Sequence, residues 1–319
     1  MKRFKNILVG VDLAQGDVLV SENLVPPTEE AVTRAIWLAK SNSARLIFFH
    51  ALPLAAINLD AQTQMLLEEH HGKRTVTDHA NEVLAIMVER ANKEGVAAES
   101  LVVHGKSWVE MIRQVLRENH DLVIVGSRRL GPVKRFMVGS TGIKLLRKCP
   151  CPVWVTQPQP ERRIASILVA HDLRPIGDLA MELACSMAQI HDAQLHVLHA
   201  AEYPEIDYML PARVSAENAA RYRQDAEEHI AAQLGRFQLA QPAQVRFVTD
   251  PPDSAILDCI ERHSIELLVM GTVARAGITG LITRNTAERL LPQIPCSVLA
   301  VKPKGFKSPV ALERSEFRP

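Results

Sequence analysis

The stretch from Gly126 to Thr141 has the residue types of a phosphate-binding loop. It reads Gly126-Ser-Arg-Arg-Leu-Gly131-Pro-Val-Lys-Arg-Phe-Met-Val-Gly139-Ser-Thr141 and leads into an apolar helical pattern. Glycines let backbone N–H groups approach an anion closely, and hydroxyls at a helix start add donors beside the positive end of the helix dipole. The sequence therefore predicts a phosphate site formed by Val125, Gly126, Ser127, Gly139, Ser140 and Thr141.

Plainer interpretations of the same loop stay open at this level. Gly126, and Gly271 in the second half of the chain, can simply end a strand, because glycine commonly punctuates loops. The loop also carries four cations that either form a solvated surface or supply charge to an anion, namely Arg128, Arg129, Lys134 and Arg135.

A nucleophile or a metal cluster is not recognisable in the sequence. The patterns Gly-x4-Gly-Lys-(Ser/Thr), Gly-x-Ser-x-Gly, His-x-Gly-His and Ser-Gly-Gly are absent. His50 and His199 lie in apolar runs, where a core histidine is a commoner role than a general base. Cys149 and Cys151 lack the second pair of a zinc site, so we expect them to pack. We predict no catalytic residue and no metal ligand, with slow ATP hydrolysis as the enzymatic alternative.

The elements that position this loop occur twice. Asn6-Ile-Leu-Val-Gly-Val-Asp12 matches Ser166-Ile-Leu-Val-Ala-His-Asp172, and Leu46-Ile-Phe-Phe-His50-Ala matches Leu195-His-Val-Leu-His199-Ala. Later, Leu122-Val-Ile-Val-Gly126-Ser matches Leu267-Leu-Val-Met-Gly271-Thr, and Cys151-Pro-Val-Trp-Val matches Cys296-Ser-Val-Leu-Ala. One order of landmarks indicates a duplicated domain, and the shift in register predicts an insertion in the first copy between Gln15 and Thr28.

Short Val/Ile/Leu runs alternate with amphipathic segments, which is the pattern of a parallel sheet covered by helices on both faces. We therefore predict an α/β protein with two tandem, doubly wound, five-stranded parallel-sheet domains. Strands are expected at 6–12, 45–51, 100–104, 121–126 and 151–156, and at 166–172, 194–200, 244–249, 266–271 and 296–301. Ser107-x-x-Glu110 predicts a capping box, and Pro251-Pro-Asp253 predicts the start of the matching helix.

The expected domains are residues 1–157 and 164–303, followed by a tail at 304–319. A doubly wound sheet binds ligands beyond the carboxyl ends of its strands, where the winding direction reverses. Asp12, Gly126, Asp172 and Gly271 fall at such ends. The two aspartates either face a ligand there or cap the following helix.

Composition limits the partners. The formal charge is +1, from 37 basic and 36 acidic residues, which gives no net field to hold nucleic acid or an anionic membrane. An aromatic content of 4% leaves little for base stacking. Five cysteines in no regular framework, and the lack of a signal-like or membrane-spanning run, favour a cytoplasmic protein.

The loop resembles the nucleotide motif of the universal stress protein family, Gly-x2-Gly-x9-Gly-(Ser/Thr). Gly126, Gly139 and Ser140 keep its spacing, but Arg129 stands at the middle glycine. In the second copy Gly271 is kept, Ala274 takes the middle position, and Arg284-Asn285-Thr286 replaces the last element. The whole of residues 4 to 303 is similar to tandem, E-type members of that family.

That resemblance implies a fold of the HUP, adenine nucleotide alpha hydrolase type, and an ATP-like adenine nucleotide, with or without Mg²⁺, held chiefly by the first domain. It assigns the adenosine half of the ligand to Asp12 and Ala51, and in the second copy to Asp172 and Ala200, with Gly271, Asn285 and Thr286 as the remaining candidates. It also implies pairing of the two domains through their last strands, with a homodimer as an extension. The expected role is a regulatory or protective module in a stress response. The alternatives are a scaffold, or a protein whose degenerate sites bind another ligand, and the ligand of the second domain is left open.

Overall fold

The structure is a computed structural model, and it describes residues 3–15, 18–60, 75–130, 135–159, 163–200, 216–272, 290–291 and 293–312. The chain divides into two compact units. Unit 1 comprises Met1–Pro160 together with Gly305–Pro319, and unit 2 comprises Glu161–Lys304. Each is described by itself below.

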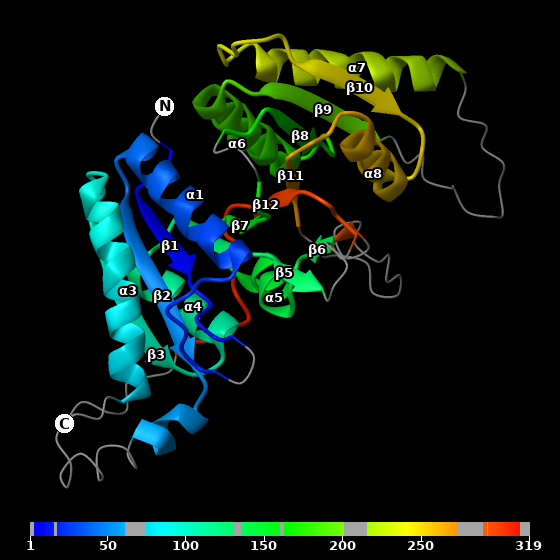
Figure 1. Ribbon diagram of the computed structural model, residues 1–319. Helices are drawn as coiled ribbons and strands as arrows, with labels where there is room; N and C mark the ends of the chain where they lie inside the picture. Colours follow the sequence, from blue (N-terminus) through cyan, green and yellow to red (C-terminus); the bar gives the residue numbers. More distant parts are fainter. Residues whose placement is uncertain are drawn as a thin grey trace, which may run out of the picture. The chain divides into compact units, whose positions relative to one another are not determined.

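Unit 1 alternates strands and helices along the chain (Figure 1). Its elements are β1 (Asn6–Gly10), α1 (Pro26–Asn42), β2 (Arg45–Leu52), α3 (Val76–Lys93), β3 (Ala98–His104), α4 (Ser107–Glu118), β4 (Leu122–Gly126), β5 (Arg128–Leu130), β6 (Arg135–Met137), α5 (Ser140–Lys148) and β7 (Val153–Thr156).

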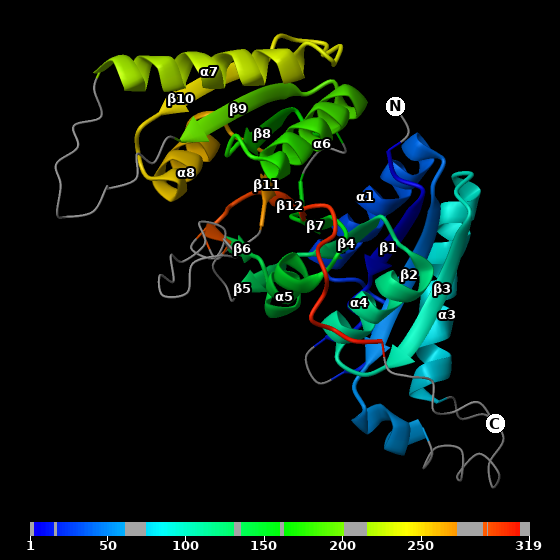
Figure 2. The same ribbon diagram turned by 180° about the vertical axis from the view of Figure 1, so that it is seen from behind.

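The main sheet of unit 1 has the order β7-β4-β1-β2-β3, and all its pairings are parallel. From β1 the chain winds through β2 to the edge strand β3, and it then returns past β1 to continue through β4 to β7. Right-handed crossovers place α1 and α3 on the face seen in Figure 1 and α4 and α5 on the face seen in Figure 2. The winding therefore reverses between β1 and β4, which is where such sheets bind ligands.

Unit 2 repeats this plan. Its elements are β8 (Ser166–Ala170), α6 (Pro175–His191), β9 (Gln194–Ala200), α7 (Ala216–Leu234), β10 (Gln244–Val248), α8 (Pro252–Arg262), β11 (Leu267–Gly271) and β12 (Ser297–Val301). Its strands are ordered β10-β9-β8-β11-β12, again all parallel. The predicted α/β class and the two parallel sheets are confirmed.

The central strands are buried on both faces because their residues are apolar without interruption. Ile7, Leu8 and Val9 of β1 and Ile167, Leu168 and Val169 of β8 are all fully buried. The helices bury one stripe each, and in α1 that stripe includes the predicted Val32, Ala35, Ile36 and Ala39. Burial of such side chains contributes roughly 1.5 to 3 kcal/mol each, which makes these strands the stable frame of each unit.

The predicted insertion lies in the connection between the first strand and the first helix. In unit 1 the chain leaves β1 at Gly10 and enters α1 only at Pro26, whereas in unit 2 it leaves β8 at Ala170 and enters α6 at Pro175. Within the longer connection, the backbones of Gln15 and Val18 donate a hydrogen bond to each other and form an isolated antiparallel β-bridge. Leu13 and Val20 are buried beneath it.

One local prediction was wrong. Ser107 is the first residue of α4 and not its N-cap, which is Lys106, and no side chain caps this helix. The carbonyl of Lys106 accepts from the backbone N–H groups of Val109 and Glu110, at 2.8 and 3.1 Å, so Lys106 is the N-cap and Ser107 is already helical. Glu110 pairs with Arg113 at 2.5 Å instead. In addition, the loop after β4 contains a short antiparallel hairpin, β5 with β6, which the sequence did not reveal.

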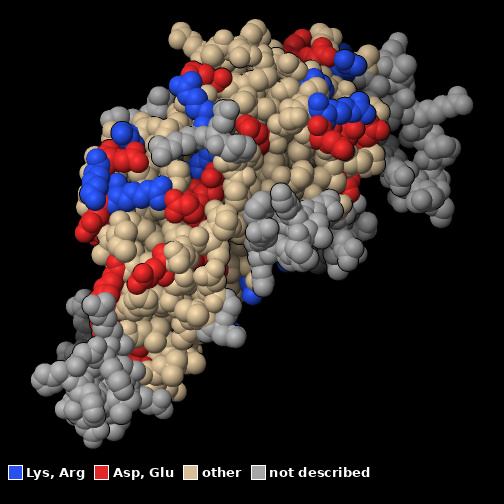
Figure 3. Space-filling view, in the orientation of Figure 1, with Lys and Arg blue, Asp and Glu red and all other residues tan. Residues whose placement is uncertain are grey.

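Among the described residues, no helix is long and apolar enough to cross a membrane. The face in Figure 3 carries cations and anions side by side, without an extended area of one sign. This agrees with a formal charge of +1.

Candidate functional site

Three predicted residues of unit 1 lie at one level along the rim of the sheet. Gly10 of β1 is in register with Phe49 of β2 and with Val125 of β4. Asp12, Ala51 and Ser127 each follow their register residue by two positions. Parallel strands end at the same edge, so these residues and the neighbouring Gly126 converge at the switch point between β1 and β4.

The N-terminus of α5 supplies the predicted anion-binding amides. Gly139 is its N-cap, with φ of −66° and no side-chain cap. Ile143 N–H bonds to the carbonyl of Gly139, but the amides of Ser140, Thr141 and Gly142 have no acceptor among the described residues. Ser140 is exposed and Thr141 half-buried. Free amides at a helix N-terminus, together with the helix dipole, favour a negatively charged group.

The hydroxyl of Ser127 is buried and has no hydrogen-bond partner in the described part of the chain. The backbone N–H of Ser127 bonds to Thr156. Thr272 is the corresponding residue of unit 2, two positions after Met270 of β11. The ammonium group of Lys302 donates to both its carbonyl and its hydroxyl oxygen, each at 2.7 Å. In unit 2 a lysine therefore supplies a hydrogen-bond donor to this threonine, whereas in unit 1 the hydroxyl of Ser127 has no described partner.

A histidine in the second strand of each unit also differs between the units in its hydrogen-bond partners. Nδ1 of His50 donates to the carbonyl of Val11 at 2.8 Å, which leaves Nε2 as a buried acceptor without a described donor. Burial lowers the pKa of His50, against the backbone bond and the charge of nearby Asp12, so the ring stays neutral. In unit 2, Nδ1 of His199 donates to the carbonyl of His171, and the Tyr222 hydroxyl donates to Nε2 at 2.8 Å.

Gly126 has a packing role that does not depend on any ligand. A Cβ at this position would lie 2.4 Å from the carbonyl oxygen of Pro27, in the first turn of α1. At Gly271 a Cβ would instead meet the side chain of Ile176, at 2.8 Å. The plainer interpretation of both glycines, close packing at a strand end, therefore holds alongside any contact with an anion.

The two aspartates do not cap the helices that follow them. The N-cap of α1 is Val25 and that of α6 is Arg174, and neither helix has a side-chain cap. Asp12 accepts from the backbone of Ala14 at 3.2 Å, and Asp172 accepts from the backbone of Arg174 at 3.1 Å. Each carboxylate thus fixes a turn just beyond its strand and stays exposed at the rim.

The structure describes only some of the residues predicted to form the site of unit 2. Asp172, Ala200 and Gly271 lie at the corresponding rim, because Ala170 is in register with Leu198 and with Met270. Asn285 and Thr286 lie outside the described residues, as do Gly131, Lys134 and Ala274. The side chains of Arg128, Arg129 and Arg135 are also outside the description.

One polar cluster of unit 2 was missed by sequence reasoning, since it joins three distant segments. Asp178 of α6 accepts from His229 of α7 at 2.7 Å and lies 3.4 Å from Nε2 of His171. Gln233 accepts from the same Nε2 at 3.1 Å. These donor atoms have the spacing of a metal site. However, Nδ1 of His171 accepts from the backbone of Leu173, so its proton sits on Nε2, which is the wrong tautomer for a metal ligand.

Cys149 and Cys151 are buried where α5 ends and β7 begins, with their sulfur atoms 3.5 Å apart. The contact with Cys149, together with burial, raises the pKa of the Cys151 thiol well above its usual value. Buried cysteines pack as small apolar groups. Their geometry therefore agrees with the packing role expected from the sequence.

Comparison with known proteins places this geometry in a family. The model of the "Universal stress protein family" matches residues 3–157 and 164–302. "Universal stress protein E" of Photorhabdus laumondii is 24% identical, over 97% of this chain and 98% of that protein. The protein of the same name from Escherichia coli K12 is 24% identical, over 99% of both.

A solved structure, described as a putative universal stress protein from Pseudomonas aeruginosa, superposes with a TM-score of 0.69 at 24% identity, covering 95% of this chain and 94% of that one. The match of both halves to the family model agrees with the duplicated sheets and with the similar rims in units 1 and 2. The chain therefore belongs to the universal stress protein family, as a tandem member homologous over its full length to universal stress protein E.

Proposed function

We propose that unit 1 binds an ATP-like adenine nucleotide at the rim formed by β1, β2, β4 and the start of α5, and that occupancy of this site sets the state of a cytoplasmic regulatory or protective module. Other universal stress proteins have been solved with AMP bound or in complex with cAMP. The proposal for this chain rests on its own residues.

The contrast between the two rims carries the proposal. Unit 1 has a buried hydroxyl at Ser127 and a buried acceptor at His50, both without described partners, and its helix α5 begins with amides that have no described acceptor. Leaving a buried polar group unpaired costs about 1 to 3 kcal/mol, and a ligand with both donors and acceptors would recover that cost. A nucleotide has this chemistry, with anionic phosphate oxygens, ribose hydroxyls and an amino group.

The proposed arrangement assigns the phosphate groups to the start of α5, where Gly139 is the N-cap and the amides of Ser140, Thr141 and Gly142 are free, and to the Val125–Ser127 end of β4. The adenosine half lies toward Asp12 and Ala51. In unit 2, Lys302 and Tyr222 already occupy the corresponding polar groups. The corresponding residues Asp172, Ala200 and Gly271 would therefore accept a nucleotide less readily, and the ligand of unit 2, with Asn285 and Thr286, is left open.

Titration of the full chain with ATP tests the proposal, with and without Mg²⁺. Gly139→Asp is the informative variant, because a carboxylate at the N-cap binds the same amides and repels phosphate. Gly139 has a φ of −66°, which residues with a side chain adopt without backbone strain. The matched control Gly139→Ala therefore adds a Cβ without the charge. We expect Gly139→Asp to lose binding and Gly139→Ala to retain it.

Folding is checked independently in these variants. All three tryptophans, Trp37, Trp108 and Trp154, lie in unit 1, so their fluorescence reports on the unit that carries the site. An N-cap aspartate stabilises a helix by about 1 kcal/mol, so Gly139→Asp should unfold no earlier than the parent chain. Equal ATP affinity in all three proteins would refute the proposed phosphate position.

A further inference from the structure

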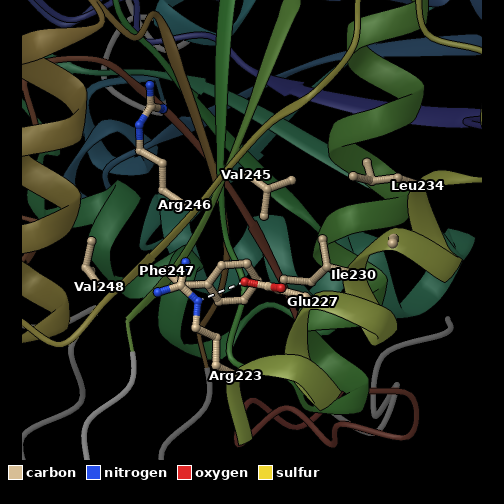
Figure 4. Close-up of a pocket in the computed structure, with 9 residues that line it drawn as sticks. Arg223, Glu227, Ile230, Leu234, Val245, Arg246, Phe247 and Val248 are labelled. Carbon is tan, nitrogen blue, oxygen red and sulfur yellow. Dashed lines mark hydrogen bonds and ion pairs between the residues drawn. The ribbon is translucent and has the colours of Figure 1, made fainter. Parts of the chain in front are cut away.

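A groove of about 560 Å³ runs between α7 and the edge strand β10 in unit 2. Figure 4 shows Val245 and Phe247 of β10 pointing toward Ile230 and Leu234 of α7. The guanidinium of Arg223, which pairs with Glu227, lies over the Phe247 ring at 5.8 Å from its centroid (Figure 4). The groove thus combines apolar side chains with one ion pair.

The groove exists because the two units cover their edge strands differently. In unit 1, α3 packs directly against β3. In unit 2, α7 does not pack against β10 in this way and makes its main contacts with α6. The outcome is that Val245 is 37% exposed on a strand where an apolar side chain would ordinarily be covered.

The outer edge of β10 offers backbone groups as well as apolar surface. Its five residues pair with β9 alone, and no other backbone hydrogen bond joins β10 to the described residues. An unpaired edge presents alternating N–H and C=O groups, which an added extended strand satisfies. Apolar side chains on alternate positions of such a strand would enter the groove beside Ile230 and Leu234.

Arg246, on the opposite face of β10, favours a partner segment that carries a negative charge. Arg246 points away from the groove (Figure 4) and bonds only to neutral acceptors, Nδ1 of His196 at 3.0 Å and the side chain of Gln244 at 2.9 Å. No carboxylate pairs with it in the described part of the chain. An acidic residue directly across from Arg246 would supply the missing charge. A second copy paired about the middle of β10 would instead set Arg246 against Arg246.

We infer that β10 and the groove beside it bind an extended segment of a partner protein, in which apolar residues flank an acidic one. The segment adds a sixth strand to the sheet of unit 2. This surface is separate from the rim of unit 1 and does not depend on nucleotide binding.

The test uses the full chain and blocked nine-residue peptides with a central Val-Glu-Val, its Val-Lys-Val counterpart, and a Val-Glu-Val peptide N-methylated at alternate residues. Fluorescence anisotropy measures binding, and hydrogen exchange locates it. We expect the acidic peptide to bind about two- to fivefold more tightly than the basic one and the methylated peptide not to bind. The amides of Val245 to Val248 should exchange more slowly when the peptide is present.

Two variants and a control separate this inference from a general effect on folding. Val245→Lys places a charge in the groove and should weaken binding at least about fivefold, whereas Ile86→Lys on α3, where Ile86 is 62% exposed, should leave it unchanged. Arg246→Glu should reverse the preference, so that the basic peptide binds more tightly.

Three results would overturn the inference. The first is no binding of any peptide to the parent chain at millimolar concentration. The second is binding without a charge preference that Arg246→Glu reverses. The third is slower exchange in β10 that depends on protein concentration and not on peptide, which would make a second copy the partner.

Discussion

The hydroxyl of Tyr222 donates to Nε2 of His199 at 2.8 Å and closes a buried acceptor that stays open at His50 in the other half of the chain. Both histidines donate through Nδ1 to the carbonyl at the end of a neighbouring strand. Both copies thus keep the histidine and its backbone hydrogen bond, and they differ in what contacts the Nε2 atom.

Tyr222→Phe should destabilise unit 2 modestly. The substitution keeps the ring beside His199 and removes only the donor. Tyr222 is 42% exposed, so water can replace part of the bond, and we expect a loss of about 1 kcal/mol in the free energy of unfolding. Urea unfolding followed by circular dichroism measures it, with Arg221→Lys on the exposed face of α7 as the control. Identical midpoints for Tyr222→Phe and the parent would show that the bond has no energetic role.

Lys302→Met should have a larger effect, because the lysine is buried and holds two oxygens of Thr272. Methionine fills similar space but donates no hydrogen bond, so both oxygens lose the lysine as a donor. We expect a loss of about 2 to 3 kcal/mol. Hydrogen exchange of β11 and β12 amides gives a readout local to unit 2. Stability equal to that of the parent would mean that the rim of unit 2 does not need its lysine.

Gly126→Ala and Gly271→Ala form a matched pair. The new Cβ meets the Pro27 backbone in the first case and a flexible Ile176 side chain in the second. Since a backbone cannot rotate away, we expect about 2 to 3 kcal/mol of destabilisation for Gly126→Ala and about 1 kcal/mol for Gly271→Ala. Tryptophan fluorescence should shift its urea midpoint only for Gly126→Ala. The opposite order of effects would exclude the close approach of β4 to α1.

Acidification should weaken the fold partly through His196. Burial, followed by the charges of His263 and Arg246, lowers its pKa from 6.5 to about 4. Between these values the unfolded chain takes up a proton that the folded chain refuses, so stability is lost as the pH falls from 6.5 toward 4. His196→Gln keeps an acceptor for Arg246 and cannot titrate. Its unfolding free energy should lose about 1 to 2 kcal/mol less than that of the parent between pH 7.5 and pH 5. Parallel pH profiles would contradict this assignment.

The sheets were predictable from the sequence because their strands carry uninterrupted apolar runs. The run Ile7-Leu-Val9 and its copy Ile167-Leu-Val169 identify the central strands, and the shifted register located the insertion before α1. The capping box at Ser107 failed because the carbonyl of Lys106, one residue earlier, accepts the first hydrogen bonds of the helix, which the residue types alone do not indicate.

The differences between the two rims could not be predicted in the same way. Tyr222 reaches His199 from a helix, and Lys302 reaches Thr272 from the end of another strand, so neither pair is near in sequence. The glycine pattern indicates an anion site in the first copy, and the second copy keeps only Gly271 of it. Which copy leaves its polar groups open is decided by side chains that only the fold brings together.

The most direct measurement of the central claim is hydrogen exchange of the full chain with and without ATP. We expect slower exchange at Ser140, Thr141 and Gly142 and at the end of β4 when ATP is present. This protection should be lost in Gly139→Asp, and the exchange of unit 2 should not change. Protection confined to the rim of unit 2, or none at α5 under saturating ATP, would contradict a nucleotide site in unit 1.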